Sequence, residues 1–262
     1  MIEVEAYRAL AERAALGRPI SAVDAPDLWY LKRGQVPDAF QVLIGCRLSA
    51  ARRLGKLLLL ETAGPDGVAG PVLGLRFGMS GRLVVDGAAG VTGLRHSTNA
   101  PLARYDRFGL LFSDGGHLRV RDPRRLGGAQ LDPAEAELGP DAGAVTVAHL
   151  RTALTASRAP LKTRLMDQSR LAGIGNLIAD EVLWRAGLSP LRPAGGLSAN
   201  ELRRLHRHLR ATVAELGARG GSHTGDLMNE RRSGGVCPTD GRSLQRATVG
   251  GRTTWWCPWH QK

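Results

Sequence analysis

Two pairs of side chains near the end of the sequence have the spacing of metal ligands. Cys237 and Asp240 are separated by two residues, as are Cys257 and His260, and sixteen residues lie between the pairs. Thiolate, carboxylate and imidazole groups all bind Zn²⁺, and two such pairs on facing turns build a zinc ribbon. The spacing therefore predicts one structural zinc ion. The alternative is a metal-free ribbon held by hydrogen bonds, with Asp240 as a turn residue before Gly241.

A glycine turn in the middle of the chain offers a site for phosphate. The Gly-Ile-Gly turn at 173–175 ends a predicted helix that begins after Pro160, because glycine adopts positive φ without steric cost. Asn176 is predicted to be the N-cap of a second helix, which ends at Gly187. Such a turn presents free backbone N–H groups to an anion. These residues alone fit an anion site and an ordinary helical hairpin equally well.

The bulk composition points to a polyanionic partner. The 262 residues carry a formal net charge of +12 at pH 7, and only four of the 36 basic residues are lysines. A strongly basic chain is typical of nucleic-acid binding. With 43% hydrophobic and 23% charged residues, we expect a soluble globular protein without a membrane span. The charged N-terminus is no signal peptide, and three cysteines favour a reducing cytoplasm.

The apolar patterns divide the chain into a β-rich part and a helical part. Residues 2–17 predict a helix, and short apolar runs with glycine between them, from about 20 to 130, predict the strands of a sandwich. A Gly, Pro and Ala stretch at 139–144 predicts a hinge. The predicted fold is α+β and multidomain, with a β-sandwich domain at 1–135, a helical domain at 145–225 and a zinc ribbon at 232–262.

The last predicted helix opens with a capping box, Ser198 and Glu201. A stripe of leucines is expected to face inward along it. Its other face carries four arginines, which we interpret as a solvated basic surface: Arg203, Arg204, Arg207 and Arg210.

The Gly-Ile-Gly-Asn turn with its following acidic helix resembles the helix–two-turns–helix element of the formamidopyrimidine-DNA glycosylase / endonuclease VIII family. In that family the asparagine that matches Asn176 and the turn amides hold the DNA backbone beside a damaged base. Because lysines are scarce in this chain, each one is a candidate site residue, and we expect Lys162 in the preceding helix to contact DNA. Matching segments extend over nearly the whole chain, so their order and spacing identify it as a member of the family.

The ribbon and a basic segment extend the resemblance. Arg252, next to a predicted hairpin turn, matches the family's DNA-binding arginine, which can fork onto a phosphate; the alternative is a solvated arginine. Lys56 resembles the lysine that contacts the lesion and its phosphate. The family has four cysteines in its ribbon. Asp240 and His260 therefore depart from the pattern, and a mixed site should hold zinc less tightly, because carboxylate is a harder ligand.

Two loops resemble those that fill the gap left by an extruded nucleotide. Met79 and Arg124 match family positions, whereas Leu126 stands where many members have phenylalanine and gives a smaller wedge. Filling the gap offsets the cost of unstacking the bases. The alternative for Met79 is ordinary core packing.

The start of the chain departs from the family pattern. The family begins Met-Pro-Glu-Leu-Pro-Glu-Val-Glu, loses its methionine and attacks C1′ of the sugar with the proline amine, and the adjacent glutamate acts as an acid. Here the chain begins Met1-Ile2-Glu3-Val4-Glu5. The natural alignment leaves the proline and the first glutamate upstream, and we interpret the short start as a matter of how the chain was delimited. A rival alignment makes Glu3 the acid and Met1 the amine, although a displaced amine loses its proximity advantage.

The resemblance implies a bifunctional base-excision DNA glycosylase with apurinic-site lyase activity. The N-terminal amine would displace the base, Lys56 would orient the lesion and Arg252 would support elimination. We expect a cytoplasmic, nucleoid-associated monomer that acts on damaged double-stranded DNA. One alternative is a lesion-binding protein without catalysis. Another is a zinc-ribbon transcription regulator, which leaves Met79, Arg124 and Lys56 unexplained. Oxidised purines and oxidised pyrimidines both remain open as substrates.

Overall fold

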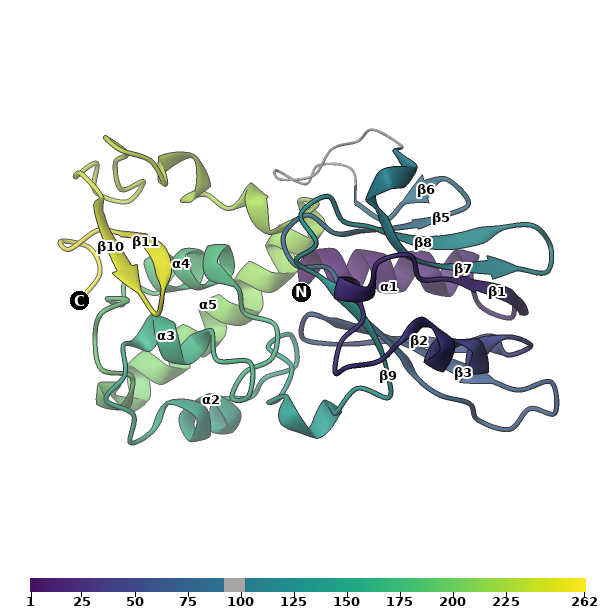
Figure 1. Ribbon diagram of the computed structural model, residues 1–262. Helices are drawn as coiled ribbons and strands as arrows, with labels where there is room; N and C mark the ends of the chain where they lie inside the picture. The colour runs from purple at the N-terminus through teal and green to yellow at the C-terminus, as the bar shows by residue number, and fades with distance from the viewer. Residues whose placement is uncertain (92–101) are drawn as a thin grey trace. The chain divides into compact units, whose positions relative to one another are not determined.

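The computed structural model describes residues 1–91 and 102–262, which divide into two compact units (Figure 1). The first unit spans Glu3–Glu135. The second comprises Ala136–Lys262 together with Met1–Ile2. The predicted helical and ribbon domains thus belong to one compact unit. Among the helices of the described residues, none is both long and apolar enough to cross a membrane.

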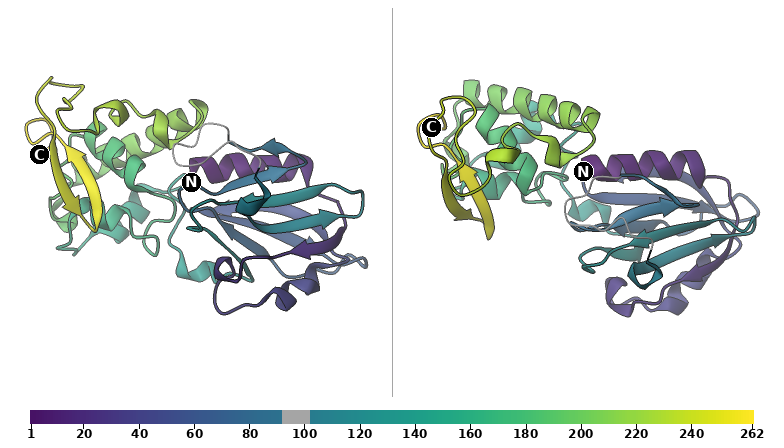
Figure 2. Two further views of the ribbon diagram at one scale, coloured as in Figure 1. Left: turned by 45° about the horizontal axis from the view of Figure 1, so that its top comes forward. Right: turned by 90° about the horizontal axis from the view of Figure 1, so that it is seen from above.

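The first unit confirms the predicted sandwich with its N-terminal helix. Helix α1 (Ile2–Ala14) ends three residues earlier than predicted, ahead of Gly17 with its φ of 77°. Two antiparallel sheets have the strand orders β1-β7-β8-β5-β6 and β2-β3-β4-β9, and Figure 2 shows them stacked as layers. The strands are β1 (Ile20–Asp24), β2 (Arg47–Leu54), β3 (Leu57–Ala63), β4 (Leu73–Arg76), β5 (Arg82–Val85), β6 (Ala88–Ala89), β7 (Asp106–Phe112), β8 (His117–Arg121) and β9 (Gly128–Leu131).

One core fills the space between the two sheets. Leu58 and Leu60 of β3 face Leu110 and Leu118 of the other sheet, and Tyr7 of α1 joins the same cluster. Strand β3 lies between β2 and β4, and its four consecutive leucines are all buried. Alternation of inward and outward residues does not apply to such a central strand, which explains its continuous apolar run. Short 3₁₀ helices connect the strands: η1 (Leu28–Tyr30), η2 (Pro37–Leu43), η3 (Ala103–Tyr105) and η4 (Glu135–Glu137).

The second unit packs four helices and a hairpin. They are α2 (Val147–Leu154), α3 (Leu161–Leu165), α4 (Asn176–Arg185), α5 (Ala199–Ala218), β10 (Gln245–Val249) and β11 (Arg252–Trp256), with the 3₁₀ helices η5 (Ala194–Gly196), η6 (Ser222–Thr224) and η7 (Met228–Glu230). The capping box of α5 is confirmed, because the Ser198 side chain accepts from the Glu201 N–H and the Glu201 carboxylate accepts from the Ser198 N–H. Its leucine stripe is buried and its four arginines are exposed, as predicted.

The hairpin turns where the two glycines permit it. Gly250 and Gly251 have φ values of 57° and 70°, and Val249 pairs with Arg252. Two consecutive positive φ angles give the turn that matches the twist of antiparallel strands. The exposed Arg252 therefore follows directly after the hairpin turn.

Candidate nucleic-acid interface

Two loops of the first unit are joined by one buried carboxylate. Asp122 is fully buried and accepts a hydrogen bond from the Ser80 hydroxyl, with an oxygen–oxygen distance of 2.5 Å. The same carboxylate accepts from the backbone N–H of Gly127 at 2.8 Å and of Arg124 at 3.2 Å. A buried carboxylate that accepts three hydrogen bonds holds its three donor groups in fixed positions. Asp122 therefore holds the 78–82 loop and the 122–127 loop in one arrangement.

These loops carry the predicted wedge residues at the surface. Met79 is 55% exposed and Leu126 is 48% exposed, and Arg124 is also exposed. A Cβ added at Gly78 would lie 2.6 Å from the Leu126 Cβ, so the two loops touch there. The alternative reading of Met79 as a core residue is wrong. The two linked loops thus present the unbranched side chain of Met79, the branched side chain of Leu126 and the planar guanidinium of Arg124.

Lys56 lies in the two-residue turn between β2 and β3, one position before the strand that it was predicted to open. It follows Gly55, whose φ is 60°, and it is half-buried. The neighbouring arginines bind carboxylates of the same unit. Arg52 pairs with Glu135 at 2.6 Å and Arg53 pairs with Glu5 at 2.9 Å. Both arginines of the basic segment thus take part in structural ion pairs.

The two N-terminal residues are anchored in the core of the second unit. The Met1 side chain is 5% exposed and that of Ile2 is 8% exposed, and both join the cluster that contains Val145 and Leu150. Glu3 is partly exposed. The predicted catalytic roles of Met1 and Glu3 stay predictions.

The glycine turn starts helix α4 one residue earlier than predicted. Gly175, with φ −115° and ψ 178°, is the N-cap, and Asn176 is the first helical residue without a capping hydrogen bond. Its Oδ1 is buried and has no hydrogen-bond partner among the described residues. The turn itself is braced by Gln168, whose amide donates to the Ile174 carbonyl at 2.9 Å and accepts from the Gly173 N–H at 3.0 Å. Because Gln168 carries no sequence motif, this brace could not be found from the sequence.

Lys162, predicted to contact DNA, lies instead in the interior of the second unit. Its side chain is 0% exposed, and its ammonium is 2.7 Å from Asp180 Oδ1 and 2.7 Å from the Thr254 hydroxyl. Arg231 binds the other oxygen of Asp180. Burial lowers the pKa of Lys162, and the charges of Arg231 and Arg252 lower it further, to about 7. Lys162 therefore joins α3, α4 and β11, and we leave it out of the proposed DNA-contacting set.

Three of the four predicted metal ligands lie close together at the end of the second unit. One ligand atom from each of Cys237, Asp240 and Cys257 lies within 4.8 Å of the others. His260 adds its Nδ1 at 3.7 Å from the Cys237 sulfur. Two buried thiols and a carboxylate that lie close together, with an imidazole beside one of the thiols, are donor types that Zn²⁺ accepts. All three cysteines of the described chain are unpaired, so the thiols are available as ligands.

The ribbon is hydrogen-bonded to α4 and to the segment that follows this helix. The Trp184 indole N–H donates to the sulfur of Cys237, a predicted metal ligand, at 3.4 Å. Gln261 donates to the Leu188 carbonyl at 3.0 Å and accepts from the Cys257 N–H at 2.9 Å. Hydrogen bonds of this kind orient ligands and are part of a metal site.

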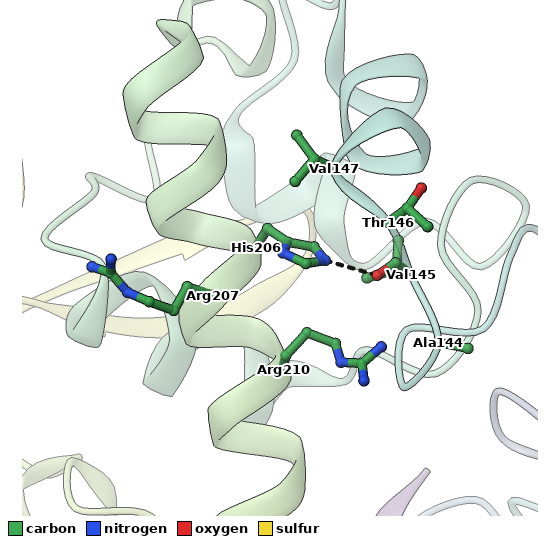
Figure 3. Close-up of a pocket in the computed structure, with 7 residues that line it drawn as sticks. All are labelled: Ala144, Val145, Thr146, Val147, His206, Arg207 and Arg210. Carbon is green, nitrogen blue, oxygen red and sulfur yellow. Dashed lines mark hydrogen bonds between the residues drawn. The ribbon is translucent and has the colours of Figure 1, made fainter.

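A separate cavity of about 550 Å³ lies on the second unit beside α5 (Figure 3). His206 Nε2 is 2.8 Å from the Val145 carbonyl at its wall, and Arg207 and Arg210 complete one side. None of the predicted site residues lines it.

Two family models match the chain. The model for the formamidopyrimidine-DNA glycosylase N-terminal domain matches residues 1–129, and the model for the formamidopyrimidine-DNA glycosylase H2TH domain matches residues 138–226. The chain is 36% identical to a formamidopyrimidine-DNA glycosylase of Paracoccus denitrificans, over 98% of this chain and 97% of that protein. It is 32% identical to one of Arabidopsis thaliana, over 99% of this chain and 70% of that protein.

A solved structure is similar along the whole chain. The complex between the Lactococcus lactis protein and a DNA that contains FAPY-dG matches with a TM-score of 0.81 and 25% identity. The match covers 100% of this chain and 99% of that chain.

Proposed function

This chain belongs to the formamidopyrimidine-DNA glycosylase family, and we propose that it is a base-excision-repair DNA glycosylase. It binds damaged double-stranded DNA as a monomer, at the nucleoid in the cytoplasm. It extrudes the damaged nucleotide and removes its base. The observation that carries the proposal is the exposed triad Met79, Arg124 and Leu126 on two loops that one buried carboxylate locks together.

The triad fits the physical demand of extrusion. An enzyme that acts on a base inside a duplex must take the nucleotide out of the stack, at a cost of about a few kcal/mol. Side chains that enter the vacated space offset part of this cost. Wedge side chains must be exposed, and the loops that carry them must be rigid. The hydrogen bonds to Asp122 hold these loops in place.

The second unit offers two groups for the DNA backbone. The amides at the start of α4 and the side chain of Asn176, with its unsatisfied Oδ1, suit a phosphate and its surroundings. The exposed Arg252 follows the hairpin turn and can donate to two phosphate oxygens. Backbone contacts of this kind place the protein on the duplex without reading its sequence.

Lyase chemistry is the finer part of the proposal. A primary amine at the chain start attacks C1′, the base departs with its bonding electrons, and a proton from a nearby acid neutralises the leaving group. Loss of the ring C1′–O4′ bond gives an imine, and removal of a C2′ proton then expels the 3′ phosphate. Lys56 orients the lesion and Arg252 supports the departing phosphate. In the rival alignment Met1 would supply the amine and Glu3 the acid, whereas the favoured alignment leaves both groups upstream of Glu3.

The ribbon would hold one zinc ion through Cys237, Asp240, Cys257 and His260. The cluster of two thiols and a carboxylate, with the His260 imidazole beside Cys237, supports this assignment. A structural ion supplies folding free energy when it binds, because it crosslinks two turns. The chain's own contribution is to orient the ligands, through the indole of Trp184 and the amide of Gln261.

The test compares two versions of the protein on two duplexes. One version is the chain as given, and the other replaces Met1-Ile2 by Pro-Glu-Leu-Pro ahead of Glu3. One duplex carries a single oxidised base and the other a single abasic site. Borohydride reduces an imine to a permanent crosslink, which a denaturing gel detects. We expect both versions to bind the abasic duplex. The extended version should excise the base, crosslink and nick the strand well, and the chain as given should crosslink poorly.

Each other outcome has a definite meaning. Efficient crosslinking by the chain as given would identify the Met1 amine as the nucleophile. Binding without excision or crosslinking by either version would favour a lesion-binding protein without catalysis. Absence of binding by both would reject the proposed function.

A further inference from the structure

We propose that the cavity beside α5 binds an acidic segment of a partner protein, and that this segment also inserts an apolar side chain. The cavity has a volume of about 550 Å³ and lies within the second unit, between α5 and the segment 144–147 (Figure 3). It contains neither Asn176 nor Arg252, the two groups proposed for the DNA backbone. The proposal therefore goes beyond the glycosylase function, because it concerns a contact with a second protein.

One wall of the cavity is apolar and fixed in place. Ala144, Val145 and Val147 line it, in the segment that leads into α2. Val145 is buried, and its carbonyl lies 2.8 Å from His206 Nε2 on α5. Because a carbonyl only accepts, this ring nitrogen carries the proton and donates it. The hydrogen bond joins the segment to α5, so the two walls of the cavity are held together.

The opposite wall carries two arginines whose charges are not neutralised within the second unit. Arg207 and Arg210 are exposed, and neither forms an ion pair among the described residues. Other arginines of the unit do: Arg185 binds three carboxylates and Arg192 binds Glu201. No aspartate or glutamate belongs to the described lining of the cavity. The cavity therefore offers positive charge that is available to a partner.

The two arginines lie on different sides of His206. Figure 3 shows Arg210 extending from α5 toward the 144–147 segment, whereas Arg207 points away from this segment at the edge of the cavity. Carboxylates on either side of an inserted apolar side chain could thus each reach one guanidinium. Thr146 and Val147, the N-cap and first residue of α2, lie on the facing wall. The start of a helix also favours negative charge, because its first N–H groups have no carbonyl partner within the helix.

An acidic peptide uses both walls, whereas DNA uses only one. Guanidinium groups bind carboxylates and phosphates with similar geometry, so the arginines alone do not distinguish the two partners. Among the described lining residues no tryptophan, tyrosine or phenylalanine offers a ring on which a base could stack. A duplex would also leave the apolar wall uncovered. A leucine or phenylalanine of a peptide would remove that wall from water, which is favourable in proportion to the apolar area that is buried.

The experiment uses a peptide with both properties and two companions that each lack one. The full chain is titrated into a fluorescein-labelled peptide, Glu-Asp-Glu-Leu-Phe-Asp-Glu, and binding is measured by fluorescence anisotropy. The first companion has Ser-Ser in place of Leu-Phe and keeps the charge. The second has the amide in place of each acid and keeps the apolar pair.

Two variants alter one wall each, and each has a matched control. Arg207→Gln with Arg210→Gln removes both cations of the cavity. Arg203→Gln with Arg204→Gln removes two exposed cations of the same helix that do not line it.

Val147→Asp places a carboxylate on the apolar wall, and Ala148→Asp places one beside it, outside the lining. Both aspartates lie in the first turn of α2, where negative charge is favourable, so both variants should fold.

We expect the Arg207→Gln/Arg210→Gln variant to bind the acidic-apolar peptide about tenfold more weakly, the loss of two partly exposed charge pairs. Val147→Asp should weaken binding at least as much, because it removes an apolar contact and adds a like charge. Both control variants should stay within about twofold. Both companion peptides should bind more weakly than the parent. Affinity for a duplex with an abasic site should be the same in the two double arginine variants.

Four results would overturn the inference. Equal losses in the two double arginine variants would show general attraction to a basic chain. Full affinity of the Ser-Ser companion would show a surface for any polyanion. A duplex affinity that falls only in the Arg207→Gln/Arg210→Gln variant, with a salt slope smaller by about two, would assign these arginines to DNA. Absence of peptide binding by the unchanged protein would reject the site. Excision of a damaged base by the unchanged protein is measured separately, so none of these results rejects the proposed function.

Discussion

A single lysine shows how burial changes the meaning of a residue. Lys162 is one of four lysines, which made it a candidate for DNA contact. In the structure its ammonium faces Asp180 and Thr254 instead of solvent. A charge at 0% exposure cannot reach a phosphate without unpacking the unit. Its partners lie 18 and 92 positions along the chain, and no local pattern connects them.

We predict that Lys162→Met lowers stability without removing a DNA contact. The change leaves Asp180 with Arg231 as its remaining partner, and the loss of one member of a buried ion pair should cost about 3 kcal/mol. Thermal unfolding measures this loss. The dependence of DNA affinity on salt should keep its slope, and Lys262→Met serves as an exposed control. A slope reduced by about one, with unchanged stability, would return Lys162 to the DNA interface.

Arg252 should behave in the opposite way. Arg252→Ala removes an exposed cation beside a hairpin turn, so stability should stay within about 0.5 kcal/mol. Affinity for the abasic duplex should fall, and the salt slope should shrink by about one, the amount expected for one lost phosphate contact. Arg246→Ala on the same hairpin is the matched control. An identical response of both variants would show general electrostatic attraction and no specific contact.

At the scale of elements, the wedge depends on a bond between two loops. Ser80→Ala removes the hydroxyl that donates to Asp122, and a buried carboxylate that loses a donor should cost about 1–3 kcal/mol. The excision rate should fall by a larger factor than the affinity for an abasic analogue, because extrusion of the nucleotide needs rigid wedge loops. Single-turnover rates and gel-shift affinities test this, with the exposed Ser113→Ala as control. A normal excision rate at a reduced melting temperature would show that the bond matters only for stability.

The capping box of α5 gives a prediction for pH. The hydrogen bonds from Arg192 and from the Ser198 backbone lower the pKa of Glu201 to about 2. The ionised carboxylate is favoured in the folded state, so its stabilisation is complete above the unfolded pKa, about 4.3. It is lost as the pH falls from there to about 2. Glu201→Gln should be about 1 kcal/mol less stable near neutral pH, and the two unfolding curves should converge in acid. A constant difference at all pH values would contradict a role for the charge.

Elements defined by neighbouring residues could be predicted from the sequence. The capping box at Ser198 and the turn at Gly250-Gly251 depend on residues a few positions apart, and both are as predicted. The predicted start of α4 was wrong by one residue. Gly175 and Asn176 both suit an N-cap, and only the backbone conformation decides between them. The carboxylate bonds of Asp122 and Asp27 could not be foreseen, since they join segments 42 and 98 residues apart.

At the scale of the molecule, loss of the metal should destabilise the second unit and leave the first unit unchanged. The ribbon and the helices form one compact unit, and the ribbon is bonded to Trp184 of α4 and to Leu188 just after it. We expect about one zinc per chain in protein purified without chelator, as one four-ligand site requires. Cys257→Ser should lose the metal and weaken DNA binding.

Hydrogen exchange should locate the effect of metal loss. Protection should fall in β10, β11 and α4, and it should stay unchanged in β3 and β7 of the first unit. Cys46→Ser is the matched control, because Cys46 is a buried thiol of the first unit. Full protection and full DNA affinity in metal-free protein would favour the ribbon held by hydrogen bonds.

The locked wedge loops also have an evolutionary consequence. At Gly78 and Gly127 an added Cβ would meet neighbouring atoms at 2.6 Å and 2.2 Å, so neither glycine can be replaced by a larger residue without moving these atoms. Met79, Arg124 and Leu126 project from the same frame into open space. Selection can therefore change these three exposed side chains while the residues that hold the two loops stay the same. A lineage can carry leucine or phenylalanine at position 126 without a compensating substitution in the core.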